Sequence, residues 1–555
     1  MPSAGEMLKN ATEHQPQLPV WITHMWQRRI EHSRLGLVLG SGVSSDADIP
    51  MWPELVARLM AAANFPSDRM DAHKNDRVPP TLLAEMAYRS HFDSQTKDHS
   101  EMHAKFRRYQ VDASWCVKIH DYLYEKVSGK SFAEITKNHI YLEPLAELLC
   151  KSEFAVTLNF DDIVDEAVIA RVDKGKGPNP EIIIRPKVET RKDAPVIYHI
   201  NGRLPREGLR GRSEHVVLTE DAFADILLSP NSQDAEFVIN QFAVRTFLLL
   251  GVSLTDNSLK NLLRSAANRN PANHHFIIYF EEDGSRKSKE VRQDLFDANL
   301  HVYNLISIFM TRDEIKALIM MLNLEMKDAE FENQLRHITK TKIDRKYYLV
   351  GSVAAGKSAT LDALRCFTTH EEWKGRVPAE MYLKDETLTD EQQDKVDRFL
   401  YPQLTLKNRR MSSEHPAIRV MDRAYLDLFA FSKSSSEIRK KALRLKEEVE
   451  DWGGHFQDGQ IFFLTASEEA FRERLAKRAL PSGDEKKIQF DPESLIAQEA
   501  KLKKIYNPEA RATFDTSDVS AGQTAKEIAR TILLKPYTTF EFSVRLGEIC
   551  KDGEL

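Results

Sequence analysis

The chain has 555 residues, of which 42% are hydrophobic and 29% are charged. A single hydrophobic core rarely serves so long a chain, so the length predicts at least two domains, and the composition is globular rather than disordered. The formal net charge of −6 excludes a general nucleic-acid-binding protein, whose surface would be basic, so no direct binding to nucleic acid is expected.

The apolar segments and the cysteines indicate the compartment. The opening MPSAGEMLKN has no apolar signal-peptide core, and the most apolar stretch, residues 242–254, is interrupted by Arg245 and is too short to cross a bilayer. Widely spaced cysteines without a C-x-x-C pair exclude a cysteine zinc ribbon and fit a reducing compartment. We therefore expect a soluble, cytoplasmic protein with neither a membrane partner nor zinc. The four cysteines are Cys116, Cys150, Cys366 and Cys550.

The first half of the chain alternates short apolar runs with helical stretches. The runs are rich in β-branched or aromatic residues, as is typical of parallel strands buried on both faces. Residues 52–63 and 221–229 are predicted helices between them. The predicted strands are LGLVLG (35–40), FAVTLNF (154–160), APVIYHI (194–200), TFLLLGVS (246–253) and HFIIYF (275–280).

A second unit of the same kind follows a polar, charged stretch at 326–345, which we expect to be a helical connector. The predicted fold class is α/β, with two doubly wound parallel-sheet domains: a Rossmann-like one at 1–325 and another at 346–540, followed by a C-terminal tail at 541–555. Ligands of such folds bind at the carboxyl ends of the strands. The predicted strands of the second domain are KYYLVG (346–351), AIRVMD (417–422), QIFFLTA (460–466) and ATFDTS (512–517).

The first strand ends in a glycine loop formed by Gly40, Ser41 and Gly42. Glycines at this position let backbone N–H groups approach a pyrophosphate, and the N-terminus of the following helix favours its negative charge. By itself a G-x-G turn is as often only a tight turn. The loop predicts a dinucleotide site only in combination with other motifs.

Further motifs in this half resemble the sirtuin family. The segment 40–52, GSGVSSDADIPMW, is similar to the sirtuin signature G-A-G-x-S-x-x-x-G-I-P-x-[FW], and TLNFDD (157–162) resembles the family's T-x-N-x-D segment. IYHINGRL (197–204) lies where sirtuins have their H-G motif. VVLTEDAF (216–223) and LLGVSLTDNSLKNLL (249–263) look like later segments of sirtuin-like domains in bacterial anti-phage defence proteins.

The resemblance spans roughly residues 20–320 and implies a domain that binds NAD+. Asp256 in this group is equally typical of a charge that stabilises the dipole at the start of a helix. The residues that the resemblance assigns to NAD+ are Gly40, Ser41, Gly42, Ser44, Pro50, Trp52, Gly251, Ser253 and Asp256.

Asn159 and Asp161 are candidate catalytic residues for releasing nicotinamide from NAD+. The release passes through an oxocarbenium-like ribose, so the protein mainly grips the pyrophosphate, orients the ribose and places a water on the opposite face. The Asn159 amide offers a donor and an acceptor to a ribose hydroxyl or to that water. Asp161 can accept from a ribose hydroxyl or fix Asn159. The alternative for both is an Asx-turn at the end of a strand.

Asn201 occupies the position of the sirtuin histidine that directly precedes the glycine. An amide cannot act as a general base near neutral pH, so a slow or inactive site is one possibility. His199 lies two residues earlier, on the same side of the strand, and is a candidate base or ribose-binding group; the alternative is a packed strand histidine. Family deacetylases use a four-cysteine zinc module that this chain cannot form. The resemblance therefore points to NAD+-hydrolysing defence effectors, with water as acceptor.

A second glycine loop, GSVAAGKS at 351–358, matches G-x-x-x-x-G-K-[ST] between an apolar strand and a helical run. Backbone N–H groups between Gly351 and Gly356 would hold the phosphates of ATP or another nucleotide. Lys357 would neutralise phosphate charge, and Ser358 would bind Mg²⁺.

The surrounding segments, over roughly residues 345–540, resemble deoxynucleoside and thymidylate kinases. AIRVMDRAYLDLFAF (417–431) is similar to their D-R-x-Y-L-D segment at a strand end. IFFLTASEEAFRERLAKRAL (461–480) is similar to their strand and lid entry, and FDTSD (514–518) to their terminal strand and base-side loop.

Five residues are candidates for the chemistry of this second unit. The resemblance implies that Asp422 acts beside Mg²⁺ and Arg423 beside the phosphoryl acceptor. Arg474 and Arg478 are four residues apart on one predicted helix face and can clamp a phosphoryl group, although a solvated basic face is the alternative. Glu380 is a candidate base for an acceptor hydroxyl, and an exposed loop acid is its alternative.

Three hypotheses of function follow. The first is an anti-phage effector that hydrolyses NAD+ under the control of nucleotide binding or phosphoryl transfer in the second unit. The second is a nucleoside or nucleotide kinase regulated by a sirtuin-like sensor of NAD+ or ADP-ribose, and the third is a non-catalytic scaffold in a defence complex. Besides NAD+ and nucleotides, the expected partners are further copies of the chain and a defence-system protein or phage-derived trigger.

Overall fold

The computed structural model describes most of the chain. The residues described are 2–63, 65, 69, 78–98, 103–176, 178–184, 194–207, 216–219, 233–255, 257–282, 284–326, 329–341, 343–382, 389–432, 434–451, 453, 455–479, 491–507 and 512–555. The predicted helix at 221–229 lies outside them.

The chain forms two compact units. The first comprises Met1–Leu18, Arg28–Arg269 and His274–Ile338, and the second comprises Pro19–Gln27, Asn270–Asn273 and Thr339–Leu555. Most of the stretch predicted as a connector therefore packs within the first unit, where it includes helix α17.

The first unit is built on a seven-stranded sheet in which every neighbouring pair is parallel. Strand β1 lies at its centre, and all five of its residues are buried because β2 and β5 flank it and helices cover both faces. Two strands, β3 and β7, were not predicted from the sequence. In spatial order the strands are β3 (Glu181–Ile183), β4 (Val196–His199), β2 (Phe154–Thr157), β1 (Leu35–Leu39), β5 (Thr246–Leu250), β6 (His275–Phe280) and β7 (Leu305–Met310).

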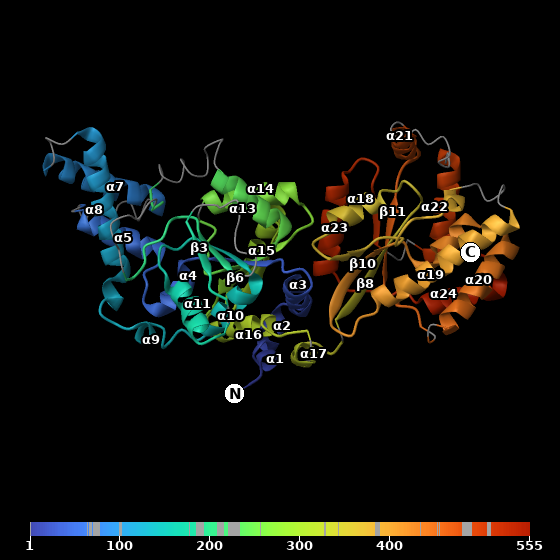
Figure 1. The fold of residues 1–555 in the computed structure, drawn as a ribbon, viewed down its shortest axis with the longest axis horizontal. Helices are drawn as coiled ribbons and strands as arrows, with labels where there is room; N and C mark the ends of the chain where they lie inside the picture. Colours follow the sequence, from blue (N-terminus) through green and yellow to red (C-terminus); the bar gives the residue numbers. More distant parts are fainter. Residues whose placement is uncertain are drawn as a thin grey trace. The chain divides into compact units, whose positions relative to one another are not determined.

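Helices lie on both faces of this sheet (Figure 1). Helices α13 and α14 pack with the apolar side chains of one face, whereas α10 and α16 contact strands from the other. Helices α5, α7 and α8, inserted between β1 and β2, pack on one another. Most of α3 (Leu18–Ile30) belongs to the second unit. The helices of the first unit are α1 (Ala4–Met7), α2 (Lys9–His14), α4 (Ser41–Ser44), η1 (Ser45–Ala47), α5 (Trp52–Ala62), α7 (Pro80–Asp98), α8 (Ala104–Tyr124), η2 (Glu125–Val127), α9 (Phe132–Ile135), α10 (Leu142–Ser152), α11 (Ile163–Asp173), α13 (Gln233–Val244), α14 (Asn257–Arg269), α15 (Lys289–Tyr303), α16 (Arg312–Leu322) and α17 (Glu330–Arg336).

The second unit is built on a five-stranded sheet that is also entirely parallel. Its first strand in the chain, β8, lies at the centre, between β11 and β10. The two all-parallel sheets with flanking helices confirm the predicted α/β, doubly wound fold class. In spatial order the strands are β12 (Ala512–Asp515), β11 (Gln460–Thr465), β8 (Asp344–Val350), β10 (Ala417–Asp422) and β9 (Thr368–His370).

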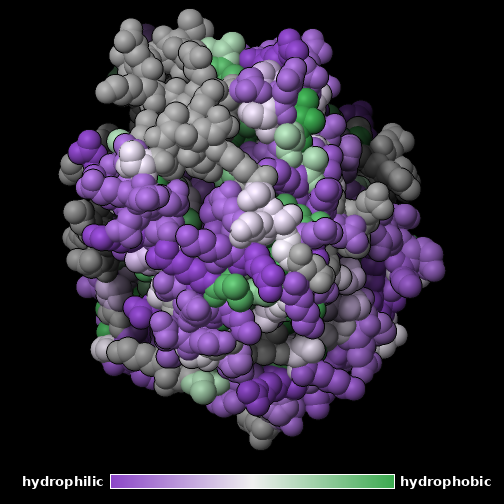
Figure 2. All heavy atoms as spheres, turned by 90° about the vertical axis from the view of Figure 1, so that its right-hand side faces the viewer, coloured by the Kyte–Doolittle hydropathy of each residue, from purple (hydrophilic) through white to green (hydrophobic). Residues whose placement is uncertain are grey.

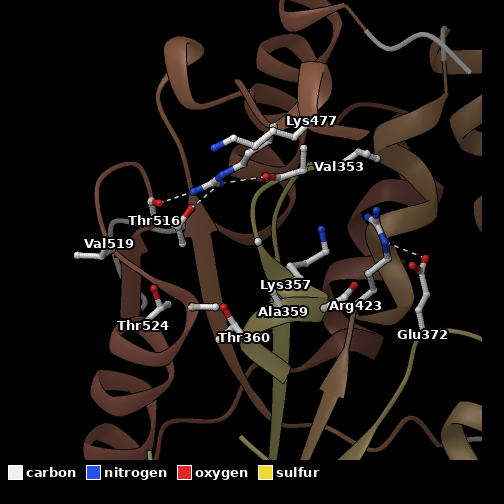
Figure 3. A pocket seen from close by; sticks show the side chains of 15 residues that line it. Val353, Lys357, Ala359, Thr360, Glu372, Arg423, Lys477, Thr516, Val519 and Thr524 are labelled. Carbon is white, nitrogen blue, oxygen red and sulfur yellow. Dashed lines mark hydrogen bonds and ion pairs between the residues drawn. The ribbon is translucent and has the colours of Figure 1, made fainter. Parts of the chain in front are cut away.

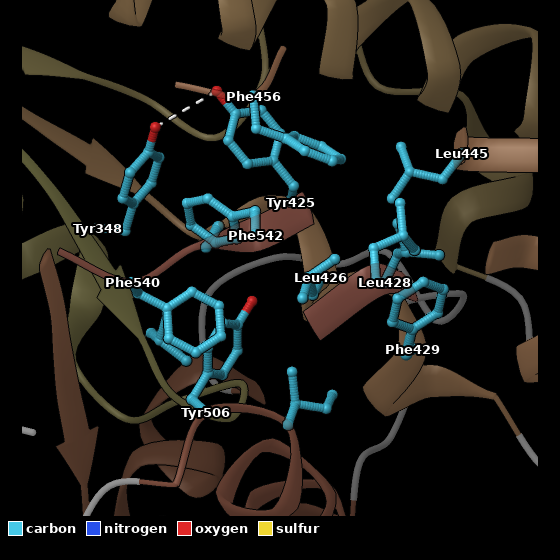
Figure 4. Packing of buried hydrophobic residues seen from close by; sticks show 14 of the residues in the cluster. Tyr348, Tyr425, Leu426, Leu428, Phe429, Leu445, Phe456, Tyr506, Phe540 and Phe542 are labelled. Carbon is cyan, nitrogen blue, oxygen red and sulfur yellow. Dashed lines mark hydrogen bonds between the residues drawn. The ribbon is translucent and has the colours of Figure 1, made fainter. Parts of the chain in front are cut away.

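An aromatic cluster fills one face of this second sheet (Figure 4). The ring of Phe542 lies 5.1 Å from that of Tyr348 and 5.0 Å from that of Tyr425. Residues 541–555, predicted as a tail, therefore include a helix whose Phe542, Leu546 and Ile549 belong to the core. The helices are α18 (Lys357–Ala363), η3 (Ala379–Tyr382), α19 (Asp390–Met411), η5 (Tyr425–Phe431), α20 (Ser435–Asp451), α21 (Glu468–Ala479), α22 (Pro492–Tyr506), α23 (Ala521–Leu534) and α24 (Phe542–Asp552).

The outer surface of the second unit is mainly hydrophilic where α20, α22 and α24 face the viewer (Figure 2). This is expected of amphipathic helices that turn their apolar faces to a core. Within the described ranges, no helix is both long enough and apolar enough to cross a membrane.

The loops that follow β1 and β5 meet backbone to backbone. The Gly40 N–H donates to Leu250 O at 2.9 Å, and the Gly42 N–H donates to Gly251 O at 3.0 Å. Gly251 has a φ of 62°, and a Cβ added there would lie 2.4 Å from the backbone nitrogen of Val43. Side chains are therefore excluded from this contact by both conformation and space.

We predict that Gly251→Ala lowers the free energy of unfolding by about 3 kcal/mol, because left-handed strain and overpacking add. Gly284→Ala is the matched control, since Gly284 also has positive φ (82°) but nothing lies within 4 Å of its added Cβ. Strain alone predicts a loss of about 1 kcal/mol for the control. Urea unfolding of the three proteins measures both losses, and equal losses would contradict the close contact.

Candidate functional site

The glycine loop after β1 makes its first contacts with the protein itself. The N–H groups of Gly40 and Gly42 were expected to face a pyrophosphate, but both donate to carbonyls of the loop after β5. Ser41 begins α4 and is partly exposed, and Gly251 lies on the other side of the contact. The glycines thus bring two strand ends together, and their contact with NAD+ stays a prediction.

Asn159 is held by the same loop. Its Nδ2 donates to Gly40 O and to Ser44 Oγ, both at 3.1 Å, and its backbone N–H donates to Thr157 Oγ1. Ser44 Oγ in turn donates to Asp161 Oδ1 at 2.8 Å. No residue that the structure describes donates to Asn159 Oδ1 or to Asp161 Oδ2. The network therefore fixes the amide orientation and leaves two acceptor oxygens for a ligand.

Burial changes the charge of Asp161. Removal from water, opposed by the Ser44 hydroxyl and the Ile163 N–H, raises the pKa of Asp161 to about 6. The folded protein therefore holds a proton on this carboxyl at pH values where the unfolded chain has released it.

His199 is fully engaged by the protein. Its Nδ1 lies 3.2 Å from the carbonyl oxygen of Asn159, and its Nε2 lies 3.0 Å from Asp165 Oδ2. Arg203 Nε also donates to Asp165 Oδ2, at 2.7 Å. Burial by itself would raise the pKa of Asp165, but His199 and Arg203 outweigh it and hold that pKa below its ordinary value. His199 and Asp165 are each 1% exposed, so this imidazole has no uncommitted nitrogen for a ligand.

A second buried group stands beside this pair. Tyr124 OH lies 2.7 Å from Leu204 O and 3.1 Å from Asp162 Oδ1, and its single proton can be donated to either oxygen. Burial, and to a lesser extent the negative charge of Asp162, raises the pKa of Tyr124 well above its ordinary value.

Asn201, which stands where sirtuins have their histidine, donates its side-chain amide to Leu158 O at 2.9 Å. Sequence reasoning missed Tyr124, Asp162 and Asp165; the only signal was the three-residue spacing of Asp162 and Asp165 at the start of α11.

The other residues that were assigned to NAD+ differ in their exposure to solvent. Pro50 is buried, and the Trp52 ring stacks on that of Phe160 at 5.6 Å. Ser253 is exposed, and its hydroxyl lies 2.7 Å from that of Thr255. Asp256 lies outside the described residues, as do residues 220–223 of the VVLTEDAF segment.

The second glycine loop opens onto a pocket of about 480 Å³ at the carboxyl end of β8 (Figure 3). Gly351 follows the strand, and Gly356, at a φ of 89°, caps α18. Figure 3 shows Lys357 between Thr516 on one side and Arg423 with Glu372 on the other. The lining residues are Val353, Ala354, Gly356, Lys357, Ser358, Ala359, Thr360, Glu372, Arg423, Arg474, Lys477, Thr516, Val519, Ala521 and Thr524.

Lys357 and Ser358 begin α18 at the floor of this pocket. The Lys357 ammonium donates to Gly351 O at 2.8 Å and to Ser352 O at 2.7 Å. Burial, together with the nearby positive charge of Arg423, lowers the pKa of Lys357 to about 8. Ser358 Oγ donates to Asp422 Oδ2 at 3.0 Å, whereas Asp422 Oδ1 is buried with no hydrogen-bond donor.

The oxygen atoms of Ser358 and Asp422 suit Mg²⁺, which takes one or two protein oxygens and completes its shell with phosphates and water. The unpartnered Asp422 Oδ1 is the observation that fits such an ion. Over the described ranges, no three or more His, Cys, Asp and Glu side chains gather closely enough to hold a metal by themselves. All four cysteines are free thiols.

Arg474 is tied to the backbone around the loop. Its Nη1 donates to Ala354 O and Thr516 Oγ1, both at 3.0 Å, and its Nη2 donates to Thr516 O. The guanidinium predicted to clamp a phosphoryl group thus joins the glycine loop to the end of β12. Lys477, three residues later on α21, lines the pocket. The side chain of Arg478 lies outside the described part.

The other end of the pocket carries a buried ion pair. Arg423 Nε lies 2.8 Å from Glu372 Oε1, and Arg423 Nη1 lies 3.6 Å from Asp427 Oδ2. Glu380, the predicted base, lies 3.5 Å from Lys395 and is not among the lining residues. Sequence reasoning missed Glu372, whose only signal is its position two residues after β9.

Residues 153–303 match the family model of the SIR2-like domain. The matched segment contains Asn159, Asp161, His199 and Asn201, and it supports the resemblance to sirtuins in the first unit. It is consistent with an activity that depends on NAD+. A search of curated proteins found no match to the chain.

We predict that Asp161→Asn removes a pH dependence of stability. The raised pKa means that the folded state loses stability as pH rises from 3.8 to about 6, and the loss above that range is on the order of 3 kcal/mol. Asparagine Oδ1 can accept the same bonds from Ser44 and Ile163 without a charge.

Urea unfolding at about pH 4.5 and about pH 7 tests this, because the variant should gain stability relative to the parent as pH rises. Asp173→Asn, at an exposed position, is the control and should show no such gain. A difference between variant and parent that stays constant with pH would contradict the assignment.

Proposed function

We propose that this protein hydrolyses NAD+ to nicotinamide and ADP-ribose as an anti-phage defence effector, under the control of nucleotide binding or phosphoryl transfer in its second unit. One observation carries the proposal. The Asn159 amide is fixed by Gly40 and Ser44 at the carboxyl ends of central parallel strands, inside the segment that matches the SIR2-like domain.

The chemistry asks little of the protein beyond position and charge. Nicotinamide is a good leaving group, and departure leaves positive charge on the ribose. Asn159 Oδ1 would accept from a ribose hydroxyl or from the attacking water, since both donors of its amide are already engaged. Asp161 would supply a second acceptor, with more negative charge above about pH 6. The reaction consumes water and releases a proton with ADP-ribose.

No free imidazole enters this scheme. His199 is committed to Asp165 and to the backbone of Asn159, so its role is to hold the strand end that carries the reactive amide. Asn201 likewise donates its amide to Leu158 O. Water is therefore activated by position and by the developing ribose charge rather than by a strong general base.

The second unit would bind a nucleotide on the loop at 351–358. Lys357 would turn from its own loop carbonyls to the phosphates, and Ser358 and Asp422 would hold Mg²⁺, which would neutralise phosphate charge. Arg423 and Glu372 would then face the phosphoryl acceptor. Homo-oligomers and a phage-derived trigger or defence partner belong to the same proposal.

Both ring nitrogens of His199 have hydrogen-bond partners within the protein. This favours a second function, a nucleoside or nucleotide kinase whose first unit only senses NAD+ or ADP-ribose. In that case ATP is consumed with a nucleoside or nucleotide acceptor, and nicotinamide never accumulates. A scaffold without catalysis would give neither product.

We predict that purified protein releases nicotinamide from NAD+ and that Asn159→Ala lowers the rate at least 100-fold, because the oriented acceptor is lost (about the size of a positioned polar group in catalysis). Asn138→Ala, at an exposed position of the same unit, is the control. Lys357→Ala should keep nicotinamide release while abolishing nucleotide binding. Chromatography of nicotinamide and ADP follows both activities, and ADP formation without NAD+ loss would select the kinase.

We predict that nucleotide binding takes up protons above about pH 8. Phosphates stabilise the charged Lys357 ammonium, whose pKa is about 8 before binding, so affinity should fall by up to about tenfold per pH unit above that value. Lys357→Arg should bind without this pH dependence, since guanidinium stays charged. Calorimetric titration of Mg·ATP in buffers of different ionisation enthalpy measures the uptake, and none in the parent would refute the assignment.

A further inference from the structure

Two charged side chains follow one another at the end of strand β10, and of these Arg423 lines the pocket. Asp422 closes the strand and accepts from Ser358, whereas Arg423 pairs with Glu372. The turn between them places Arg423 at a φ of 61°, a left-handed conformation that few residues other than glycine adopt. Without another contact this turn would tend to relax, and either side chain would lose its direction.

Lys407 supplies that contact from helix α19. Its ammonium donates to the carbonyl oxygen of Asp422 at 3.2 Å and to that of Arg423 at 2.9 Å. Lys407 is 3% exposed, so these bonds form out of contact with bulk water. The same nitrogen lies 5.9 Å from the ring centre of Trp373, the residue after Glu372. The Lys407 ammonium therefore lies next to both segments that carry charged groups of the site: the turn with Asp422 and Arg423, and the segment with Glu372.

Burying an ammonium group costs free energy unless hydrogen bonds and opposite charges compensate for the lost contact with water. Burial lowers the pKa of Lys407, and Glu372, Asp427 and Asp422 oppose that shift. An apolar residue of similar length would remove the charge but would leave two buried carbonyl oxygens without a donor, next to a strained turn. The arrangement suits a residue that fixes the turn rather than one that only fills the core.

We propose that Lys407 is a positioning residue for the nucleotide site of the second unit: it holds the turn after β10 so that Asp422 meets Mg²⁺ and Arg423 meets the phosphoryl acceptor. This inference rests on the proposed nucleotide-binding function of that unit. Helix α19, which carries Lys407, lies outside the sequence motifs that predicted this site.

The test compares Lys407→Met with Lys501→Met in the full chain. Lys501 also donates to a backbone carbonyl of this unit, Ser432 O at 2.6 Å, but Ser432 lies outside the turn after β10. The first measurement is amide hydrogen exchange without nucleotide. Lys407→Met should speed exchange in peptides covering 417–426 and 351–360, and Lys501→Met should leave both unchanged.

The second measurement is ATP affinity with Mg²⁺ and with the metal chelated. The gain in affinity from Mg²⁺ should shrink about tenfold in Lys407→Met, as for other residues that orient metal ligands, and should stay unchanged in Lys501→Met. A merely structural role would weaken both conditions equally. If Lys407→Met does not fold, Lys407→Gln, with a shorter amide donor, carries the same prediction.

Unchanged exchange together with an unchanged Mg²⁺ gain would overturn the inference. Parent protein that binds no ATP would instead overturn the proposed nucleotide site. In that case the exchange measurement still decides whether Lys407 holds the turn, because it uses no nucleotide.

Discussion

Close contact between two glycine-lined loops is the constraint on which the first unit depends. Gly40 and Gly42 after β1 lie against Gly251 after β5, with no room for a Cβ between them. This contact sets the position of the Gly40 carbonyl, which accepts from the Asn159 amide. The amide in turn leaves one oxygen for a ligand. A backbone requirement, rather than a long-range charge, therefore determines where the Asn159 amide lies.

Both units bury charges at strand ends and neutralise them locally. Asp165 is enclosed by His199 and Arg203, and Arg423 is enclosed by Glu372 and Asp427. Buried ion pairs contribute little net stability, but loss of one partner leaves an uncompensated charge. Such clusters therefore restrict side-chain directions more than they strengthen the fold.

Local sequence signals predicted most strands of both sheets, but not β3 or the fully buried β7. They failed for β9, which has three partly exposed residues, and consequently for Glu372, which it positions beside Arg423. They also failed for the partners of His199, because Asp165 and Arg203 approach it only once α11 and the loop after β4 have packed. Spacing indicates that Arg474 is on an exposed helix face, but not that its guanidinium is bound by backbone carbonyls. Side-chain commitments between distant elements are set by tertiary packing, which periodicity does not encode.

The aromatic cluster of the second unit has a consequence for biosynthesis. Phe542, Leu546 and Ile549 contribute side chains to the core that also contains Tyr348 and Val350 of strand β8. A nascent chain emerges from the ribosome in order, so that core stays incomplete until translation has passed Ile549. Within this unit the glycine loop after β8 is synthesised early, whereas α24, which completes the aromatic core, is synthesised last. Chaperones would meet an open aromatic surface throughout that interval.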